Sequence, residues 1–362
     1  MGTGVGDRRE EAAEIRALLT LMIRPGLSDR GVKDLVESCG SGVRALRSLG
    51  VQTDFLGPES DDPPLDDWVR RGYQIVPMTS VRYPAALLQL TDPPPILFLD
   101  GATEFLESEA VAIVGSRKAT EGGRRAAETM GRVLSEAGLT VVSGMALGID
   151  GAAHRGALLG GGRTVAVLGS GLQVVYPAGH RRLSHDIRQS GLLVSEFLPN
   201  QPALRHHFPK RNRIIAALAA AVVVVEAGER SGALITVDHG LDLGREVLAV
   251  PGAVENPQAR GSNALLRDGA RAIPDPEAIL DELRALGIAL DVCSGKRRLE
   301  KGTAHAVPAG LRRIWGALST EPRGVGDVAH SAEISVAEAM AGLSALELGG
   351  WARQCPGMRY RR

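Results

Sequence analysis

The sequence predicts an α/β fold, in which a doubly wound and mostly parallel sheet follows a small helical domain and precedes a winged-helix domain. Three observations predict this fold. Six short β-branched runs between residues 111 and 252 alternate with helical stretches, which is the pattern of parallel βαβ units. Apolar residues recur at helical spacing within residues 10–50, and the C-terminal segment suggests three helices followed by a two-stranded wing.

The composition limits the classes of protein that this chain can represent. The chain has 362 residues, enough for two or three domains, and its 42 lysines and arginines equal its 42 aspartates and glutamates. A site for a polyanion must therefore be a local patch and not the whole surface. The three cysteines, Cys39, Cys293 and Cys355, lack metal-binding spacing, so we expect neither a metal nor a disulfide framework.

The charges and apolar runs indicate a cytoplasmic protein. No apolar stretch follows the charges of the N-terminus, as a secretory signal would require. The longest apolar run covers residues 214–225 and is shorter than the roughly 20 residues of a membrane-spanning helix. A helix end followed by a buried strand explains that run better. We therefore expect no membrane partner.

Residues 10–50 predict three short helices, broken at RPGLSDRG and SCGSG. The apolar positions at helical spacing are Ile15, Leu18, Leu19 and Met22, and then Val32, Leu35 and Val36. The joint GPESDDPPLDD follows, and its prolines and aspartates are expected to separate this unit from the next one. The expected role of the helices is structural.

The six β-branched runs are the strands of the predicted sheet. They are VAIVG, LTVVSG, TVAVLG, LLVSEF, AVVVVEA and EVLAVPG, beginning at residues 111, 139, 164, 192, 221 and 246. Polar ligands of such a sheet bind outside the carboxyl ends of its strands. The residues that follow these runs are therefore the candidate site residues.

The C-terminal part of the chain predicts a linker and a winged-helix module. Residues 291–308 mix glycine, proline and charge without periodicity, as linkers do. Three helices are predicted beyond them, the third with an apolar face at Val336, Met340, Leu343 and Leu346, and WARQCPGMRYRR predicts the wing. The seven arginines of the module exceed its five carboxylates by only two, so duplex binding and a protein-contact role both stay open.

The segment at 205–213, RHHFPKRNR, concentrates four cations and one aromatic ring without a carboxylate. It leads through a helix into the strand at 221, which places it at the rim of the sheet. A ring among cations suits a single strand of nucleic acid, because bases stack on the ring while phosphates meet the charges. The alternative is a solvated charged surface with Phe208 in the core.

Three further loops have phosphate-binding character. They are AIVGSR at 112–117, SGMALGIDGAAH at 143–154 and ERSGALIT at 229–236, each with glycine at a strand end or helix start. Glycine lets a backbone approach a phosphate, and the N-terminus of a helix is electropositive. Several such loops on one edge of a sheet suit the successive phosphates of a polymer.

Cofactor and catalytic motifs are incomplete. The segment GSGLQVVYP at 169–177 begins like a dinucleotide fingerprint, but Val174 replaces the third glycine, and no Walker loop occurs. NAD and ATP therefore lose support, and we expect no cofactor. Asp150 and His154 have the spacing of a charge pair on a helix, although a packing or capping histidine is the commoner role at such a position.

A series of motifs occurs along the chain in a characteristic order and spacing. They are AIVGSR, SGMALGIDGAAH, TVAVLGSGLQVVYP, SEF, FPKRNRII, VVVEAGERSGALIT, and REVLAVPG followed by GSNALLRDGA, and the match runs from about residue 83 to residue 273. In these motifs the chain resembles the DNA-processing protein A family (DprA, also called Smf). The resemblance implies a Rossmann-like domain that binds and protects single-stranded DNA and helps to load RecA recombinase during uptake of transforming DNA.

The resemblance also implies site residues and partners. Carried over motif by motif, the contacts to single-stranded DNA are Ser116, Arg117, Gly144, Phe208, Lys210, Arg211, Asn212, Arg213, Ser231 and Gly232. The implied partners are RecA, a single-strand-binding protein and a second copy of the chain in a homodimer. His180, in YPAGH, stands where the family often has asparagine, which concerns the local turn more than the DNA site.

The family's three-part layout assigns boundaries to the domains. A helical, SAM-like domain would cover residues 1–60, the Rossmann-like domain that binds single-stranded DNA residues 70–290, the linker residues 291–308, and the winged helix residues 309–362. The match is looser at both ends than in the middle. No motif identifies residues that contact RecA or form the dimer.

Two other functions stay open at this point. A phosphoribohydrolase-like enzyme on the same fold would use Glu196 or Glu226 as its acid or base. The PGGxGT-type loop of such enzymes is not present at VPGAV, and we expect both carboxylates to lie beside cations that hold them ionised. A transcription factor would act through the winged helix, and the small positive excess of that module disfavours this function.

Overall fold

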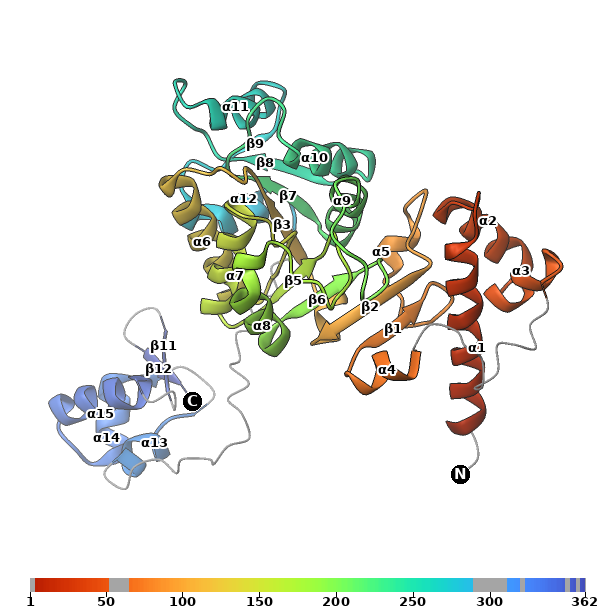
Figure 1. The fold of residues 1–362 in the computed structure, drawn as a ribbon. Coiled ribbons are helices and arrows are strands. Elements are labelled where there is room, and N and C mark those ends of the chain that lie inside the picture. The colour runs from red at the N-terminus through yellow and green to blue at the C-terminus, as the bar shows by residue number, and fades with distance from the viewer. Residues whose placement is uncertain are drawn as a thin grey trace. The chain divides into compact units, whose positions relative to one another are not determined.

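The computed structural model describes residues 4–51, 65–288, 311–319, 323–348, 352–355 and 359–361. The chain divides into two compact units, Met1–Gly295 and Lys296–Arg362 (Figure 1), and each is described by itself. The N-terminal helices belong to the same unit as the large sheet. The predicted linker at 291–308 lies outside the described residues.

The first unit is built on a sheet whose described strands have the order β1-β2-β6-β5-β4-β3-β7-β8-β9. Six parallel strands coincide with the six predicted runs: β3 (Ala110–Val114), β4 (Thr140–Ser143), β5 (Thr164–Val167), β6 (Leu192–Ser195), β7 (Ala221–Val224) and β8 (Glu246–Ala249). The chain winds outward from β3 to β6 and then continues from β7 on the other side of β3. The sheet is therefore doubly wound, with its switch point between β3 and β7, and the predicted fold class is confirmed.

Three strands lie outside the predicted set. They are β1 (Gln74–Pro77), β2 (Ile96–Gly101) and β9 (Arg271–Ala272). β2 pairs antiparallel with β6, β1 pairs antiparallel with β2, and β9 extends the opposite edge beside β8. No local sequence pattern predicts these strands, because β1 and β2 stand outside the βαβ repeat and β9 has only two residues.

Helices cover both faces of the sheet (Figure 1). On one face α6 (Glu121–Glu136) and α7 (Ile149–Leu159) share a core with Val111 and Ile113 of β3. On the other face α9 (His207–Leu218) and α10 (Ala233–Asp242) share a core with Ala112 and Val114. Successive side chains of a strand point to opposite faces, so a strand that is covered on both faces is apolar throughout.

The remaining helices of the first unit are short. They are α4 (Leu65–Arg70), α5 (Ala85–Leu88), α8 (Arg181–Ser190), α11 (Arg260–Arg267) and α12 (Ile279–Ala285), with 3-10 turns at Thr103–Leu106, Ala178–His180, Pro257–Ala259 and Pro276–Ala278. No helix in the described part of the chain has the length and apolar character needed to cross a bilayer.

The three helices predicted at 10–50 are present as α1 (Gly4–Ile23), α2 (Asp29–Cys39) and α3 (Gly42–Ser48). Ser28 caps α2 by accepting a hydrogen bond from the N–H of Gly31, and Ser41 caps α3 in the same way. Glu14 of α1 accepts from the N–H of Gly42 at 2.6 Å, which joins α1 to α3. Most of the joint that follows lies outside the described residues.

The second unit has the winged-helix arrangement that the sequence predicts. Its elements are α13 (Arg312–Gly316), β10 (Arg323–Gly324), α14 (Val325–Ala332), α15 (Val336–Leu348), β11 (Arg353–Cys355) and β12 (Arg359–Arg361), with the antiparallel order β10-β12-β11. A small core that includes Ile314, Val328 and Leu343 holds the helices together.

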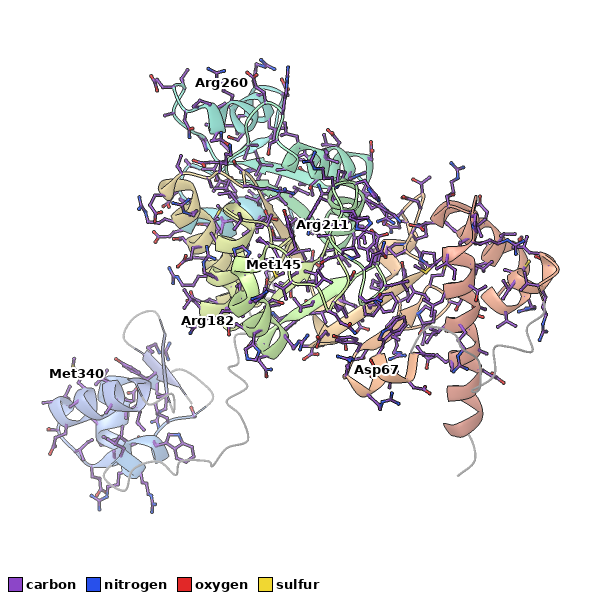
Figure 2. The ribbon with its side chains drawn as sticks, viewed as in Figure 1. Asp67, Met145, Arg182, Arg211, Arg260 and Met340 are labelled. Carbon is purple, nitrogen blue, oxygen red and sulfur yellow. The ribbon has the colours of Figure 1, made fainter. Side chains whose placement is uncertain are left out.

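The predicted apolar face of α15 is only partly correct. Leu343 and Leu346 are buried, but Val336 and Met340 are 55% and 43% exposed, and Figure 2 shows Met340 on the outside of the unit. The buried stripe also includes Ala339, which the prediction omitted. Because successive residues of a helix are 100° apart, Met340 lies well away from a stripe centred on Ala339, Leu343 and Leu346.

Candidate nucleic-acid interface

A cavity of about 820 Å³ opens beside the switch point of the sheet. The loop after β3, the loop before α10 and the first turns of α9 form its wall. Seven of the ten predicted residues line it: Ser116, Arg117, Phe208, Arg211, Asn212, Ser231 and Gly232. Gly144 lines a neighbouring cavity of about 80 Å³ that shares Arg117 and Phe208 with the larger one.

Phe208 lies between an aromatic ring and a cation. The ring centroids of Phe208 and Tyr176 are 5.3 Å apart, and the guanidinium carbon of Arg117 lies 4.9 Å from the centroid of Phe208. Phe208 is half-buried and rests against Gly169, where a Cβ would come within 2.8 Å of the ring. The alternative that Phe208 is a core residue is therefore wrong, because part of its ring faces the cavity.

The loop after β3 is held against the loop after β7. The N–H of Ser116 donates to the carbonyl of Glu226 at 2.6 Å, and the hydroxyl of Ser116 donates to Gln258 at 2.5 Å. Arg117 and Lys118 then turn outward and are exposed. The loop thus presents two cations at the cavity, and the hydrogen bonds of Ser116 to Glu226 and Gln258 hold its backbone in place.

Arg211 holds the floor of the site. Its side chain is buried, and its guanidinium donates to the carbonyl of Gly144 at 2.7 Å and to that of Val167, at the ends of β4 and β5. Figure 2 shows Arg211 and Met145, the neighbour of Gly144, inside the first unit. Burial lowers the pKa of Arg211 to about 10, so this side chain still carries its charge at neutral pH.

The motif FPKRNR divides between two faces of α9. Phe208, Arg211, Asn212 and Ile215 follow the i, i+3, i+4, i+7 spacing of one helical face, and all four line the cavity. Lys210 and Arg213 lie on another face. A helix separates residues that are adjacent in the sequence, so the cationic run does not form one continuous charged surface.

Arg213 lies at the centre of an ion-pair cluster formed by Asp29, Asp92, Glu196, Lys210 and Arg213. Its guanidinium donates to both carboxylate oxygens of Glu196, at 2.9 and 2.8 Å, and lies 3.2 Å from Asp29 and 3.1 Å from Asp92. The side chain of Arg213 is 3% exposed. This corrects the expectation that Arg213 meets DNA phosphates, because three carboxylates already surround it.

The loop before α10 provides open space at the cavity. Asn212 donates from its side-chain amide to the carbonyl of Gly232 at 3.2 Å, and the hydroxyl of Ser231 accepts from the N–H of Ala233. A Cβ placed on Gly232 would meet no atom within 4 Å, and its φ is negative. The fold therefore does not require glycine at this position, although a ligand that approaches the backbone closely would benefit from it.

Comparison with known families shows to which family this chain belongs. Residues 74–284 match the family described as DNA recombination-mediator protein A, and residues 300–358 match the DprA winged helix domain. The chain belongs to the DNA recombination-mediator protein A family. Protein Smf of Escherichia coli is 38% identical to the chain over 299 residues, which cover 82% of this chain and 80% of that protein.

Other members of the family are similar to large parts of the chain. DNA processing protein DprA of Streptococcus pneumoniae is 42% identical over 200 residues, 55% of this chain and 71% of that protein. Its X-ray structure superposes with a TM-score of 0.58 at 31% identity, covering 76% of this chain and 96% of that one. The Helicobacter pylori protein, solved to describe its single-stranded DNA binding mode, has a TM-score of 0.54 at 28% identity, with coverages of 59% and 96%.

The carboxylates that an enzyme of this fold would use have structural partners in this family member. Glu226 accepts from the N–H and hydroxyl of Thr120, at 2.8 and 2.6 Å, and so fixes the start of α6. Asn256 donates a third hydrogen bond to it, and no described cation forms an ion pair with Glu226, so the expectation of a cation beside this carboxylate is wrong. The expectation holds for Glu196, which Arg213 and Lys210 neutralise.

His154 is a packing residue, as its commoner role predicts. Its Nε2 accepts from the N–H of Met145 at 3.3 Å, and its Nδ1 bonds the hydroxyl of Thr164 at 2.7 Å. Burial lowers the pKa of His154 to about 3, so it is neutral, and the charge pair with Asp150 that its spacing permits does not form. His180, which stands where the family often has asparagine, forms a hydrogen bond through Nδ1 with the carbonyl of Met145. This bond holds the turn at YPAGH in place.

Several residues of the cavity wall are absent from the predicted site residues, although Tyr176, Arg205 and Arg230 lie within segments that the sequence pattern had marked. Lys118, Tyr176, Arg205, Arg230 and Gln258 line the cavity, and four of them are exposed. Lys118 follows the predicted VGSR motif directly, and Arg230 stands before the predicted Ser231 and Gly232. Extending AIVGSR by one residue would have found Lys118, whereas Arg230 already stood within the predicted motif ERSGALIT.

Proposed function

We propose that this chain binds single-stranded DNA in the 820 Å³ cavity, protects it, and helps to load RecA recombinase onto it. The observation that carries the proposal is the position of Phe208, whose ring faces the cavity between Tyr176 and Arg117. An aromatic ring among cations binds a single strand with little sequence preference, because every base has a face that stacks and every nucleotide has a phosphate.

The distribution of charge around the cavity favours a polyanion. Five cations line it, Arg117, Lys118, Arg205, Arg211 and Arg230, and Asp150 is its one carboxylate. Asp150 is buried, and burial raises its pKa, while it accepts hydrogen bonds from the N–H groups of Gly144 and Ala146. In a chain without net charge, this local excess is the electrostatic signature of a nucleic-acid site.

The bases of a duplex could not stack on the aromatic rings of this site. Base pairing and stacking cover the faces that Phe208 and Tyr176 would contact, so a duplex could offer only its phosphates. The family resemblance supports single-stranded DNA as the ligand. The contacts that we propose come from Ser116, Arg117, Gly144, Phe208, Arg211, Asn212, Ser231 and Gly232, with Lys210 as a further contact.

We propose that the protein acts without catalysing a reaction and without a cofactor. Glu196 and Glu226, the two candidate acid or base residues, have ion-pair and hydrogen-bond partners that fix them in structural roles. Such environments suit a proton donor poorly. Hydrolysis of nucleotides by the pure protein, lost in a Glu226→Gln variant with normal DNA affinity, would contradict this part of the proposal.

The partners and location that we propose follow from the family resemblance. They are RecA, a single-strand-binding protein that coats the same DNA, and a second copy of the chain in a homodimer, all in the cytoplasm. The exposed side chains of Val336 and Met340 on α15 support a protein contact for the winged helix over a duplex contact, because duplex binding requires cations on that surface.

A filament-assembly assay tests the mediator function. The protein should speed assembly of RecA on single strands coated by a single-strand-binding protein, Phe208→Ala should lose most of that effect, and Arg182→Ala should keep it. Arg182 is 95% exposed on α8 and does not line the cavity, so it controls for loss of a surface charge. A wild-type protein that binds single strands but leaves RecA assembly unchanged would contradict the loading role.

A further inference from the structure

Lys210 is held by carboxylates from two distant segments. Its ammonium lies 2.7 Å from Asp29, the first residue of α2, and 3.3 Å from Glu196, in the loop after β6. The backbone of Lys210 stands at the cavity, because Pro209 and Arg211 on either side both line it. The charged end of the side chain is therefore directed into the ion-pair cluster, while its main chain belongs to the cavity rim.

The charges of the ion-pair cluster leave no positive excess at Lys210. Three carboxylates, Asp29, Asp92 and Glu196, face the two cations Lys210 and Arg213. Burial alone would lower the pKa of Lys210, but Glu196 and Asp29 outweigh it and raise the pKa, so the ammonium stays charged. A DNA phosphate would have to compete with these carboxylates for it.

The two carboxylates that hold Lys210 differ in how firmly they are fixed. Glu196 is 2% exposed and is held on both oxygens by hydrogen bonds from Arg213. Asp29 is 17% exposed, and it would keep its contact with Arg213 if Lys210 left. As the first residue of α2, it also lies where a helix terminus stabilises a negative charge. Asp29 is therefore the partner that Lys210 can exchange at low cost.

We propose that Asp29 masks Lys210 and so limits the affinity of the protein for single-stranded DNA, with the Asp29 carboxylate and a DNA phosphate competing for one ammonium. This inference rests on the proposed function. It gives the N-terminal helices an indirect role at the DNA site, because Asp29 acts through Lys210 and does not itself contact DNA. The long, flexible stem of a lysine allows the ammonium to move between the two anions. Affinity differences between related complexes arise mostly in the dissociation rate, so a protein of limited affinity releases its DNA faster. Faster release suits a protein that must pass its DNA on.

The test compares Asp29→Asn with the matched control Asp34→Asn. Asp34 is exposed five positions further along α2, so both variants remove one negative charge from the same helix. Asp29→Asn should bind a single-stranded oligonucleotide about twofold to fivefold more tightly than the control, the range of an accessible charge pair. Its dependence of log affinity on log salt should steepen by about 0.7, because one more phosphate is engaged.

A double variant assigns the gain to Lys210. Adding Lys210→Met should remove both the tighter binding and the steeper salt slope of Asp29→Asn. A gain that persists in the double variant would overturn the inference, as would an Asp29→Asn protein of unchanged thermal stability that binds no better than Asp34→Asn. If Asp29→Asn unfolds, Asp29→Ser gives the same comparison, since serine is compatible with a helix start.

The same titration separates this inference from the proposed function. If the wild-type protein binds no single-stranded DNA, the proposed function fails and the inference fails with it. If the wild-type protein binds and the Asp29 variants match Asp34→Asn, the inference alone fails.

Discussion

Replacing Arg213 with methionine should destabilise the protein by about 3–5 kcal/mol, the cost of removing one partner from a buried ion pair. Glu196 is 2% exposed and receives two hydrogen bonds from Arg213, so the variant leaves a buried carboxylate with Lys210, at 3.3 Å, as its remaining cation. Asp29 and Asp92 lose the same partner. The effect should appear as a lower urea midpoint with an unchanged m value.

Two variants control for this loss of stability. Arg267→Met removes an exposed arginine paired with its neighbour Asp268 and should change stability by less than about 1 kcal/mol. Combining Arg213→Met with Glu196→Gln should recover part of the loss, because the unpaired buried charge is gone. A loss below about 1 kcal/mol in Arg213→Met would contradict the structural role of the ion-pair cluster. So would a folded Arg213→Met whose only defect is a flatter salt dependence of DNA binding.

Replacing Phe208 with alanine should weaken binding of single-stranded DNA by about 1–3 kcal/mol, the range for loss of one base-stacking ring. The salt dependence should stay nearly unchanged, because Phe208 contacts no phosphate. Fluorescence anisotropy with a labelled oligonucleotide at several salt concentrations measures both quantities. The half-buried ring makes only part of its contacts with the protein, so the variant should fold.

Conservative variants separate stacking from packing at Phe208. Phe208→Leu keeps apolar volume against Gly169 but removes the aromatic face, and it should bind almost as weakly as Phe208→Ala. Phe208→Tyr keeps the face and should bind nearly as well as the wild-type protein. A leucine variant with wild-type affinity would show that no base stacks on this ring.

Elements of the fold could be predicted from the sequence where a local residue pattern marks them. The six parallel strands could be predicted because each is a short apolar run followed by a helix, and all but β6 are closely followed by a glycine. β2 could not, because its antiparallel partner β6 comes about 90 residues later in the chain, and no local pattern marks that pairing. The helices and the two-stranded wing of the winged-helix module were predicted, but its third strand β10 was not. The exposure of Met340 depended on which side of α15 packs against the small core.

Most residues of the candidate site were predicted from the sequence, but their arrangement in space was predicted only in part. The motifs located the cavity, yet a linear run of cations does not show that Phe208 and Arg211 share one face of α9 while Lys210 and Arg213 share another. The carboxylates that neutralise the second pair come from elsewhere: Asp29 is 184 positions from Arg213. Only folding brings such charges together, so sequence reasoning assigned to DNA an arginine that the structure assigns to Glu196.

A competition titration tests the central claim, that the cavity binds single strands by stacking and charge. A labelled single-stranded oligonucleotide bound to the wild-type protein is challenged with unlabelled single-stranded or duplex DNA of the same sequence, over a series of salt concentrations. Single strands should displace the label far better than duplex at every salt concentration, and log affinity should fall linearly with log salt. Equal competition by duplex would contradict the claim, because phosphates alone would then account for the binding.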